Sequence, residues 1–279
     1  MLPDTLGIIG LGAIGGSIAR QASGGVRRVL GYTRRPAEGV AAVRAGAVTE
    51  LASSAAYVMR HADLVVLAVP PAGAFMLLAE ARTHLGQGAV CTDVASVKVP
   101  VMDAARRLGL NARFAGSHPL VRSQRRGFAA AEARRFAGAL VYVTPAADDD
   151  AVAREVADFW ASVLEAEPVM VDAEDHDVIV AWTSHLPQAV ALAVTHALAA
   201  HGPRGVTYGP GARDVARVAD GDAATLRDVL LLNRSAVLEA LDCCEASLGA
   251  LRRALEDGDP VALGRWLDAA AAWRRRLGP

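Results

Sequence analysis

Two short segments carry residue types and spacings that are suited to chemistry. Near the start of the chain, Gly10, Gly12 and Gly15 have G-x-G-x-x-G spacing between an apolar run and helix-forming residues. Further along, the segment Gly116-Ser117-His118-Pro119 contains a histidine, and a neutral imidazole accepts protons near pH 7 because its unperturbed pKa is about 6.5. The two segments predict a nucleotide site with a general base, His118, beside it. A histidine that only caps a loop is the alternative.

The glycine segment predicts a strand, a tight turn and a helix. Gly10 would allow the turn, Gly12 would let the backbone approach a pyrophosphate, and Gly15 would allow close packing of the helix on the strand. The start of the helix would offer unpaired N–H groups to the phosphates, so Ala13 and Ile14 are also expected to bind the cofactor. A turn that is merely rich in glycine is the alternative.

The end of the second predicted strand, 28–32, bears on the choice of cofactor. An NAD-binding protein usually has an acidic residue there, which binds the ribose 2′-hydroxyl. This chain has Thr33, Arg34 and Arg35 instead, and a hydroxyl with two guanidinium groups suits a 2′-phosphate. The sequence therefore favours NADP and leaves NAD possible. The alternative is that both arginines are ordinary surface charges.

Strands and helices continue to alternate after this point. Apolar runs predict further strands at 62–69, 88–94, 139–145 and 167–171. Ligands of a doubly wound sheet lie beyond the carboxyl ends of its strands. We therefore expect Val69, Pro70 and Asp93 to contact the cofactor, and the segment 116–119 to follow a strand at the same edge.

The pattern changes after Asp172 to long helical segments. Helices are predicted at 175–201, 223–256 and 260–277. The stretch 182–198 is apolar nearly all round, which fits burial against a second subunit. The chain is thus predicted to be an α/β protein, with a Rossmann-type doubly wound sheet in residues 1–172. An all-helical domain in residues 173–279 would form a homodimer.

Composition excludes several classes of partner. The chain has 279 residues, of which 53% are hydrophobic, and a net charge of −1, so it lacks the basic excess of a nucleic-acid-binding protein. No targeting segment is recognised, and no run reaches the eighteen or so uncharged apolar residues of a membrane span. We expect a cytoplasmic protein. Cys91, Cys243 and Cys244 have neither metal-ligand spacing nor an even disulfide framework, so no metal is expected.

The chain resembles the prephenate and arogenate dehydrogenase family of tyrosine biosynthesis over nearly its whole length. The motifs that carry the resemblance are 10–15, 92–98, 116–119, 183–187 and 213–219, followed by Asn233. The resemblance implies oxidative decarboxylation, in which a cyclohexadienol loses a hydride to a nicotinamide cofactor and its ring carboxylate leaves as carbon dioxide. His118 would accept the proton of the hydroxyl.

The resemblance also implies roles for other residues. Ser96 would orient His118 or share its contact with the hydroxyl, and a helix N-cap is a compatible role. Arg217 matches the carboxylate-binding arginine of the family, whereas Arg213, at the start of the same segment, does not match that position. The alternative is that both arginines are surface charges on a helix. His176 resembles a family position that could simply stabilise the domain junction. The candidate substrate-binding residues are Ser117, Gln124, His185, Gln188 and Arg217, although His185 would as readily be a core residue.

Departures from the family pattern bear on the substrate. Many members carry a carboxylate after the His-Pro pair, which could bind the ammonium group of arogenate, whereas this chain has Arg122 and Gln124. Arg122 would repel that ammonium group and attract the keto acid of prephenate. Gln188 stands where many members have a second histidine. We therefore predict an NADP-preferring prephenate dehydrogenase, with arogenate or an amino-substituted prephenate as alternative substrates.

Two other classes stay open. Another dehydrogenase of similar build could act on a β-hydroxy acid or an imine, but the β-hydroxyacid enzymes usually rely on a lysine in the helical domain, and no lysine follows Lys98. A nucleotide-binding sensor would bind the cofactor without turnover. The two predicted domains leave no room for a regulatory or mutase domain, so we expect any feedback control to act at the active site.

Overall fold

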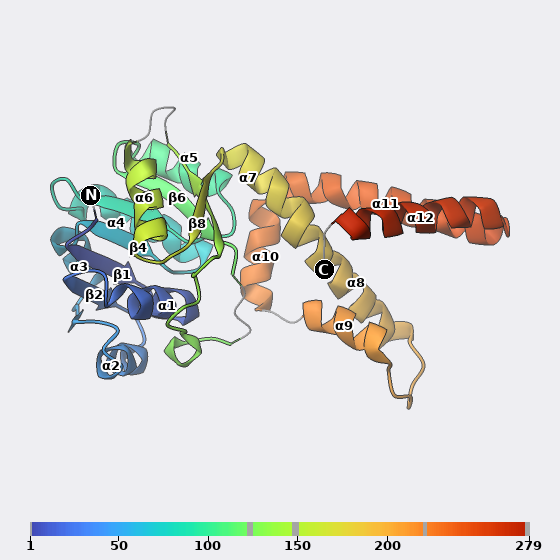
Figure 1. Ribbon diagram of the computed structural model, residues 1–279, viewed down its shortest axis with the longest axis horizontal. Helices are drawn as coiled ribbons and strands as arrows, with labels where there is room; N and C mark the ends of the chain where they lie inside the picture. The colour runs from blue at the N-terminus through green and yellow to red at the C-terminus, as the bar shows by residue number, and fades with distance from the viewer. Residues whose placement is uncertain (1, 122–124, 147–150, 220–221, 277–279) are drawn as a thin grey trace. The chain divides into compact units, whose positions relative to one another are not determined.

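An eight-stranded mixed sheet forms the core, with the strand order β3-β2-β1-β4-β5-β6-β7-β8 (Figure 1). The computed structural model describes residues 2–121, 125–146, 151–219 and 222–276. The strands are β1 (Thr5–Ile9), β2 (Arg28–Tyr32), β3 (Glu50–Leu51), β4 (Leu64–Leu67), β5 (Val90–Asp93), β6 (Phe114–Pro119), β7 (Leu140–Thr144) and β8 (Glu167–Met170). Neighbouring strands are parallel except for β6 and β7, which pair antiparallel.

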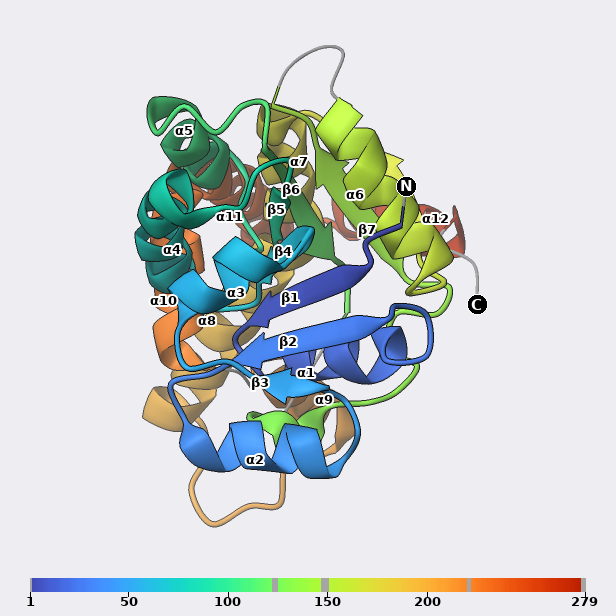
Figure 2. The ribbon, with the colours of Figure 1, turned by 90° about the vertical axis from the view of Figure 1, so that its left-hand side faces the viewer.

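Helices cover both faces of the sheet. One face packs against α1 (Ala13–Ala22), α2 (Pro36–Arg44) and α6 (Ala151–Ser162), and the other against α3 (Ala55–His61), α4 (Pro71–His84) and α5 (Val99–Arg107) (Figure 2). Side chains of β1 alternate between the two cores, since Leu6 and Ile8 join the first and Ile9 joins the second. This arrangement confirms the predicted doubly wound α/β fold.

The end of the sheet differs from the sequence-based expectation. Residues 116–119 do not follow a strand but belong to β6 itself, where His118 pairs with Tyr142 of β7. Antiparallel pairing with a distant strand leaves no periodic signal in the sequence. β3 was not predicted either, because two residues are too few for a pattern.

The rest of the described chain is helical. It contains α7 (Ala173–Val180), a π-helical turn (Ala181–His185), α8 (Leu186–His201), α9 (Pro210–Val218), α10 (Ala223–Leu232), α11 (Arg234–Glu256) and α12 (Pro260–Arg276). By contacts the chain divides into two compact units, 1–233 and 234–279, and the second consists of the α11–α12 pair. The predicted helix 223–256 breaks at Asn233, whose backbone leaves helical geometry and whose side chain makes buried hydrogen bonds.

The helical run Ala173–His201 is long and apolar enough to cross a membrane by length and composition alone. Its mean hydropathy is 1.4, and 22% of the apolar window is buried. The expectation that no run reaches this length therefore needs correction. Ser, Thr, His and Gln residues interrupt the apolar character of the run, and Glu174, Asp175 and Asp177 lie at its start. One such helix is a weak indication of a membrane span, because the core helices of soluble proteins pass the same test.

Candidate active site

The glycine turn between β1 and α1 has the geometry that a dinucleotide requires. Gly10 has a φ of +106°, and a Cβ there would lie 2.2 Å from the carbonyl oxygen of Ala68. A Cβ on Gly15 would lie 1.9 Å from the carbonyl oxygen of Gly10, whereas one on Gly12 would meet nothing within 4 Å. Two glycines are thus required by the backbone, and the third leaves open space at the uncapped start of α1. These residues fit a pyrophosphate.

A cavity of about 550 Å³ begins at this turn. Residues that follow β1, β4 and β5 line it together with residues from the helical part of the first unit. The lining includes Gly12, Ala13, Ile14, Arg35, Val69, Pro70, Ala95, Ser96, Arg125, Arg126, Ser184, His185, Gln188, Arg217, Asp222, Thr225 and Leu226. Residues predicted to bind the cofactor and residues predicted to bind the substrate therefore line one cavity.

The predicted 2′-phosphate site lies at the start of α2. Arg35 lines the cavity, and its Nη1 lies 3.1 Å from a carboxylate oxygen of Glu38. Thr33 Oγ1 accepts a hydrogen bond from the backbone N–H of Arg35, and Arg34 is exposed. The contact with Glu38 was not predicted, because no carboxylate directly follows β2. Because Glu38 lies three residues after Arg35, in the first turn of α2, its side chain lies next to Arg35.

Asp93, at the end of β5, and Ser96, just after it, have different surroundings. Ser96 lines the cavity. Asp93 is fully buried, where its carboxylate accepts a bond of 2.6 Å from the Lys98 ammonium group and one of 2.9 Å from the backbone N–H of Ala95. Asp93 thus stabilises the turn that presents Ser96, because a buried carboxylate needs such partners.

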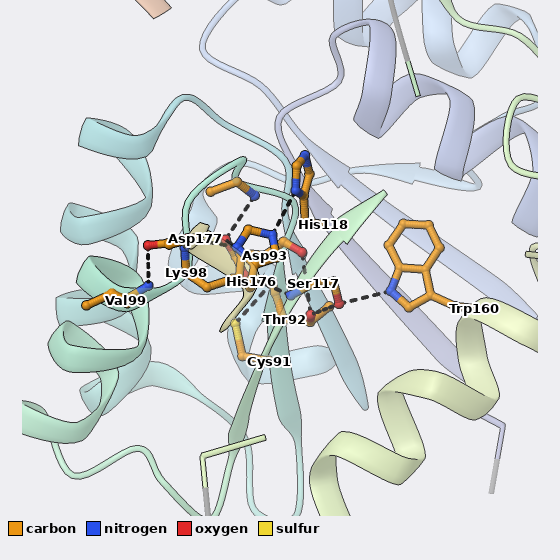
Figure 3. Close-up of polar contacts among 11 residues, drawn as sticks. Cys91, Thr92, Asp93, Lys98, Val99, Ser117, His118, Trp160, His176 and Asp177 are labelled. Carbon is orange, nitrogen blue, oxygen red and sulfur yellow. Dashed lines mark hydrogen bonds and ion pairs between the residues drawn. The ribbon is translucent and has the colours of Figure 1, made fainter. Parts of the chain in front are cut away.

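Ser117 also has its side chain in the interior. Its Oγ lies 2.7 Å from Oγ1 of Thr92 and accepts a bond of 3.0 Å from the indole N–H of Trp160 (Figure 3). The residue is fully buried. Since side chains alternate along a strand, the burial of Ser117 on one face of β6 directs His118 to the other.

His118 belongs to a chain of three polar side chains (Figure 3). Its Nδ1 lies 2.9 Å from Nε2 of His176, whose Nδ1 lies 2.7 Å from Oδ1 of Asp177. Burial lowers the pKa of His118 well below 6.5, with further lowering by His176, Lys98 and His185, so the imidazole is neutral at pH 7. His118 is 9% exposed and is not among the residues that line the cavity.

His185 lies on the π-helical turn, just before Pro187. A proline has no N–H for the helical ladder, and π turns accommodate such interruptions. The Nδ1 atom of His185 lies 3.1 Å from Nδ2 of Asn233. The same Nδ2 donates a hydrogen bond of 2.7 Å to the carbonyl oxygen of Asp177. Burial lowers the pKa of His185 to about 4.

Arg217 of α9 and Gln188 of α8 both line the cavity. Arg213 is exposed and is not among the lining residues. Gln124, together with Arg122, lies outside the described residues.

The sequence did not predict the charged lining residues Arg125, Arg126 and Asp222, of which Asp222 forms an ion pair with Arg126. The only sequence signal was a pair of adjacent arginines, which has no specificity. The contacts between His118 and His176 and between His185 and Asn233 had no local signal, because they join residues 58 and 48 positions apart.

The fold and the cavity define a nicotinamide-dependent oxidoreductase: a glycine turn on a doubly wound sheet opens into a cavity that also contains a serine, a neutral histidine and arginines. Such side chains suit transfer of a proton and binding of carboxylates.

Comparison with known proteins agrees with this assignment. Residues 17–166 match the family model described as prephenate dehydrogenase, nucleotide-binding domain, and residues 172–269 match prephenate dehydrogenase, dimerization domain. The chain belongs to the prephenate dehydrogenase family. It is 30% identical to the prephenate dehydrogenase of Bacillus subtilis over 99% of this chain and 76% of that protein.

Two solved structures are also similar. The prephenate dehydrogenase of Aquifex aeolicus in complex with hydroxyphenyl propionate and NAD+ has a TM-score of 0.91, with 26% identity over 99% of this chain and 98% of that one. The arogenate dehydrogenase of Synechocystis has a TM-score of 0.83, with 26% identity over 98% of this chain and 99% of that one. Relatives named for either substrate thus have this fold.

Proposed function

We propose that this protein is an NADP-preferring prephenate dehydrogenase, which converts prephenate and NADP+ into 4-hydroxyphenylpyruvate, carbon dioxide and NADPH. The observation that carries the proposal is that one cavity of about 550 Å³ joins the glycine turn to Ser96, His185 and Arg217. The Aquifex aeolicus relative, solved with NAD+ and hydroxyphenyl propionate, supports a cavity for both a dinucleotide and a phenolic acid.

Each residue then has a chemical task. Gly12, Ala13 and Ile14 bind the pyrophosphate with their backbone, and the bound nicotinamide supplies the hydride acceptor. His118 accepts the proton of the ring hydroxyl as the carbon that bears it loses a hydride and gains carbonyl character, and Ser96 orients the same hydroxyl. After carbon dioxide leaves, the ring oxygen takes a proton back to give the phenol. Loss of carbon dioxide makes the ring aromatic, which drives the reaction.

Charge in the cavity favours prephenate over arogenate. Arg125, Arg126 and Arg217 line it, and prephenate presents two carboxylates without an ammonium group. The acidic residue among the described lining residues, Asp222, is engaged by Arg126 and by the first amides of α10. An ammonium group would therefore meet mainly positive charge. Arogenate and an amino-substituted prephenate are the alternative substrates.

The preference for NADP rests on Arg35. Arg35 lines the cavity, and a guanidinium suits a 2′-phosphate, whereas Glu38 beside it offers an acceptor to the 2′-hydroxyl of NAD. NADP is favoured over NAD, because Arg35 is among the lining residues and Glu38 is not.

The enzyme is further proposed to be a cytoplasmic homodimer that associates through its helical domain. Val178, Trp182 and Val194 of the long apolar run are between 40 and 49% exposed, and an exposed apolar surface of this kind fits a subunit interface. A second subunit would cover the run that otherwise resembles a membrane span. Light scattering should give twice the chain mass for protein from the soluble fraction, whereas a monomer would contradict the interface.

The test of the function is absorbance at 340 nm with prephenate and arogenate, each against NADP and NAD. The expected result is the fastest reduction with prephenate and NADP. Activity with arogenate alone would overturn the substrate assignment, and a preference for NAD would overturn the role of Arg35. No signal in any of the four combinations would reject both substrates.

A further inference from the structure

We propose that Asp177 is a positioning residue that gives His118 and His185 opposite tautomers. Its carboxylate leaves Nε2 of His118 as a proton acceptor, and its carbonyl oxygen leaves Nε2 of His185 as a proton donor. The roles of these two nitrogens rest on the proposed function, whereas the tautomers follow from the hydrogen bonds alone.

The tautomer of His118 depends on the carboxylate of Asp177. Its two oxygens accept bonds from the backbone N–H groups of Lys98 at 2.7 Å and Val99 at 3.0 Å, which fix its position at the start of α5. A carboxylate can only accept, so the Nδ1 of His176 that lies 2.7 Å away carries a proton. Burial lowers the pKa of His176, which leaves the ring neutral and its Nε2 unprotonated.

The unprotonated Nε2 of His176 can only accept a hydrogen bond, so His118 has to donate one to it. Its Nδ1 lies 2.9 Å from the unprotonated Nε2 of His176, so Nδ1 of His118 carries the proton and its Nε2 does not. Figure 3 shows the other ring nitrogen of His118 directed away from His176. His118 is thus held in the form that can accept a proton from a substrate hydroxyl.

The tautomer of His185 depends on the backbone carbonyl oxygen of Asp177. This oxygen can only accept, so the atom of Asn233 that lies 2.7 Å away is the amide nitrogen. The same nitrogen lies 3.1 Å from Nδ1 of His185 and donates its second hydrogen there. Nδ1 of His185 is therefore unprotonated, and the neutral ring carries its proton on Nε2.

The two histidines are thus complementary at the reaction centre. His118 offers an acceptor where the hydroxyl proton is lost, and His185, which lines the cavity, offers a neutral donor to an oxygen of the substrate. One residue sets both forms through atoms of its own side chain and backbone, comparable to the aspartate that fixes the histidine tautomer in a catalytic triad.

The test is a long-range ¹H–¹⁵N spectrum of protein labelled with ¹⁵N-histidine, recorded at pH 8 without substrate. The chain has seven histidines, and His118→Asn and His185→Asn identify the two signals by their loss. We expect the Nδ1–H pattern for His118 and the Nε2–H pattern for His185. The reverse pattern for either ring would overturn the proposal, and no variant has to be active for this measurement.

Two variants test the connections. His176→Asn can place its amide N–H groups where Nδ1 of His176 faces Asp177, but the shorter side chain leaves no acceptor at the position of Nε2. The His118 signal should therefore change to the Nε2–H pattern, and kcat should fall about tenfold or more. Asn233→Asp presents only acceptors, so His185 should gain a proton on Nδ1. The matched control is Asp175→Asn, an exposed carboxylate on the same helix, which should change neither signal. Unchanged signals in both test variants would overturn the proposal.

The spectra also separate this inference from the proposed function. Correct tautomers without turnover of prephenate would reject the function alone. Turnover of prephenate with the reversed tautomers would reject the positioning role alone.

Discussion

The ammonium nitrogen of Lys98 lies 2.6 Å from Oδ2 of Asp93, and both side chains are fully buried. Burial lowers the pKa of Lys98, and the charge of Asp93 opposes that effect. Lys98→Met should therefore leave an uncompensated buried carboxylate and lower the free energy of unfolding by about 3 to 5 kcal/mol. Urea denaturation measures the loss.

Two comparisons identify the cause of that loss. Replacing Asp93 by Asn in the Lys98→Met background should restore part of the stability, since the lone charge is then removed. Arg106→Ala breaks an ion pair that is about two-fifths exposed on α5 and should cost less than about 1 kcal/mol. Equal losses for Lys98→Met and Arg106→Ala would contradict the interpretation.

His118→Asn should reduce kcat by roughly 10²-fold or more, because the proton acceptor is lost. Binding of NADP, measured by fluorescence titration, should be unchanged, since His118 is not among the residues proposed to bind the cofactor, Gly12 to Ile14 and Arg35. Because the pKa of His118 lies well below 6.5, the acidic limb of the kcat profile in the native enzyme should also lie below pH 6.5. Full activity of the variant would remove His118 from the mechanism.

Arg217→Ala should raise the KM for prephenate by at least tenfold, because a charge-assisted contact with a carboxylate is lost. Steady-state kinetics at saturating NADP measures this change. Arg213→Ala on the same helix α9 is the matched control, because Arg213 is exposed and is not among the lining residues. Similar effects of both substitutions would indicate a general loss of positive charge rather than a specific contact.

Arg35→Ala should weaken binding of NADP by tenfold or more and leave binding of NAD within about twofold, since only NADP has a 2′-phosphate. The neighbouring Arg34→Ala should have a smaller effect, because Arg34 is not a lining residue. Arg44→Ala, at the other end of α2, controls for net charge. Equal weakening of both cofactors by Arg35→Ala would make Arg35 a general phosphate contact.

Stability should fall as the pH drops from 7 to 5. The unfolded chain binds a proton at His185 below about pH 6.5, whereas the folded chain excludes it down to a pKa of about 4. This difference contributes about 2 kcal/mol of destabilisation between pH 7 and pH 5. Urea titrations at several pH values should show a smaller decrease for His185→Gln than for the native chain. His201→Gln, an exposed position on α8, should leave the decrease unchanged.

The sequence by itself determined the class of fold and the position of the glycine turn. Both depend on local patterns: an apolar run before Gly10, the G-x-G-x-x-G spacing, and alternating strands and helices. It also determined that the chain after Asp172 is helical and that the stretch 182–198 is largely apolar. These patterns can be recognised in the sequence because each lies within one or two consecutive helices or strands.

Only the tertiary structure decided how distant side chains pair. Asp93 was predicted to contact the cofactor, yet its carboxylate is buried in an ion pair with the Lys98 ammonium group. His176 was a residue of uncertain role until folding brought it 2.9 Å from His118. The break of a predicted helix at Asn233 also involves a distant contact. The side-chain amide of Asn233 donates a hydrogen bond to the carbonyl oxygen of Asp177, which lies 56 positions away. Hydrogen bonds across such separations depend on the complete packing, and no local pattern records them.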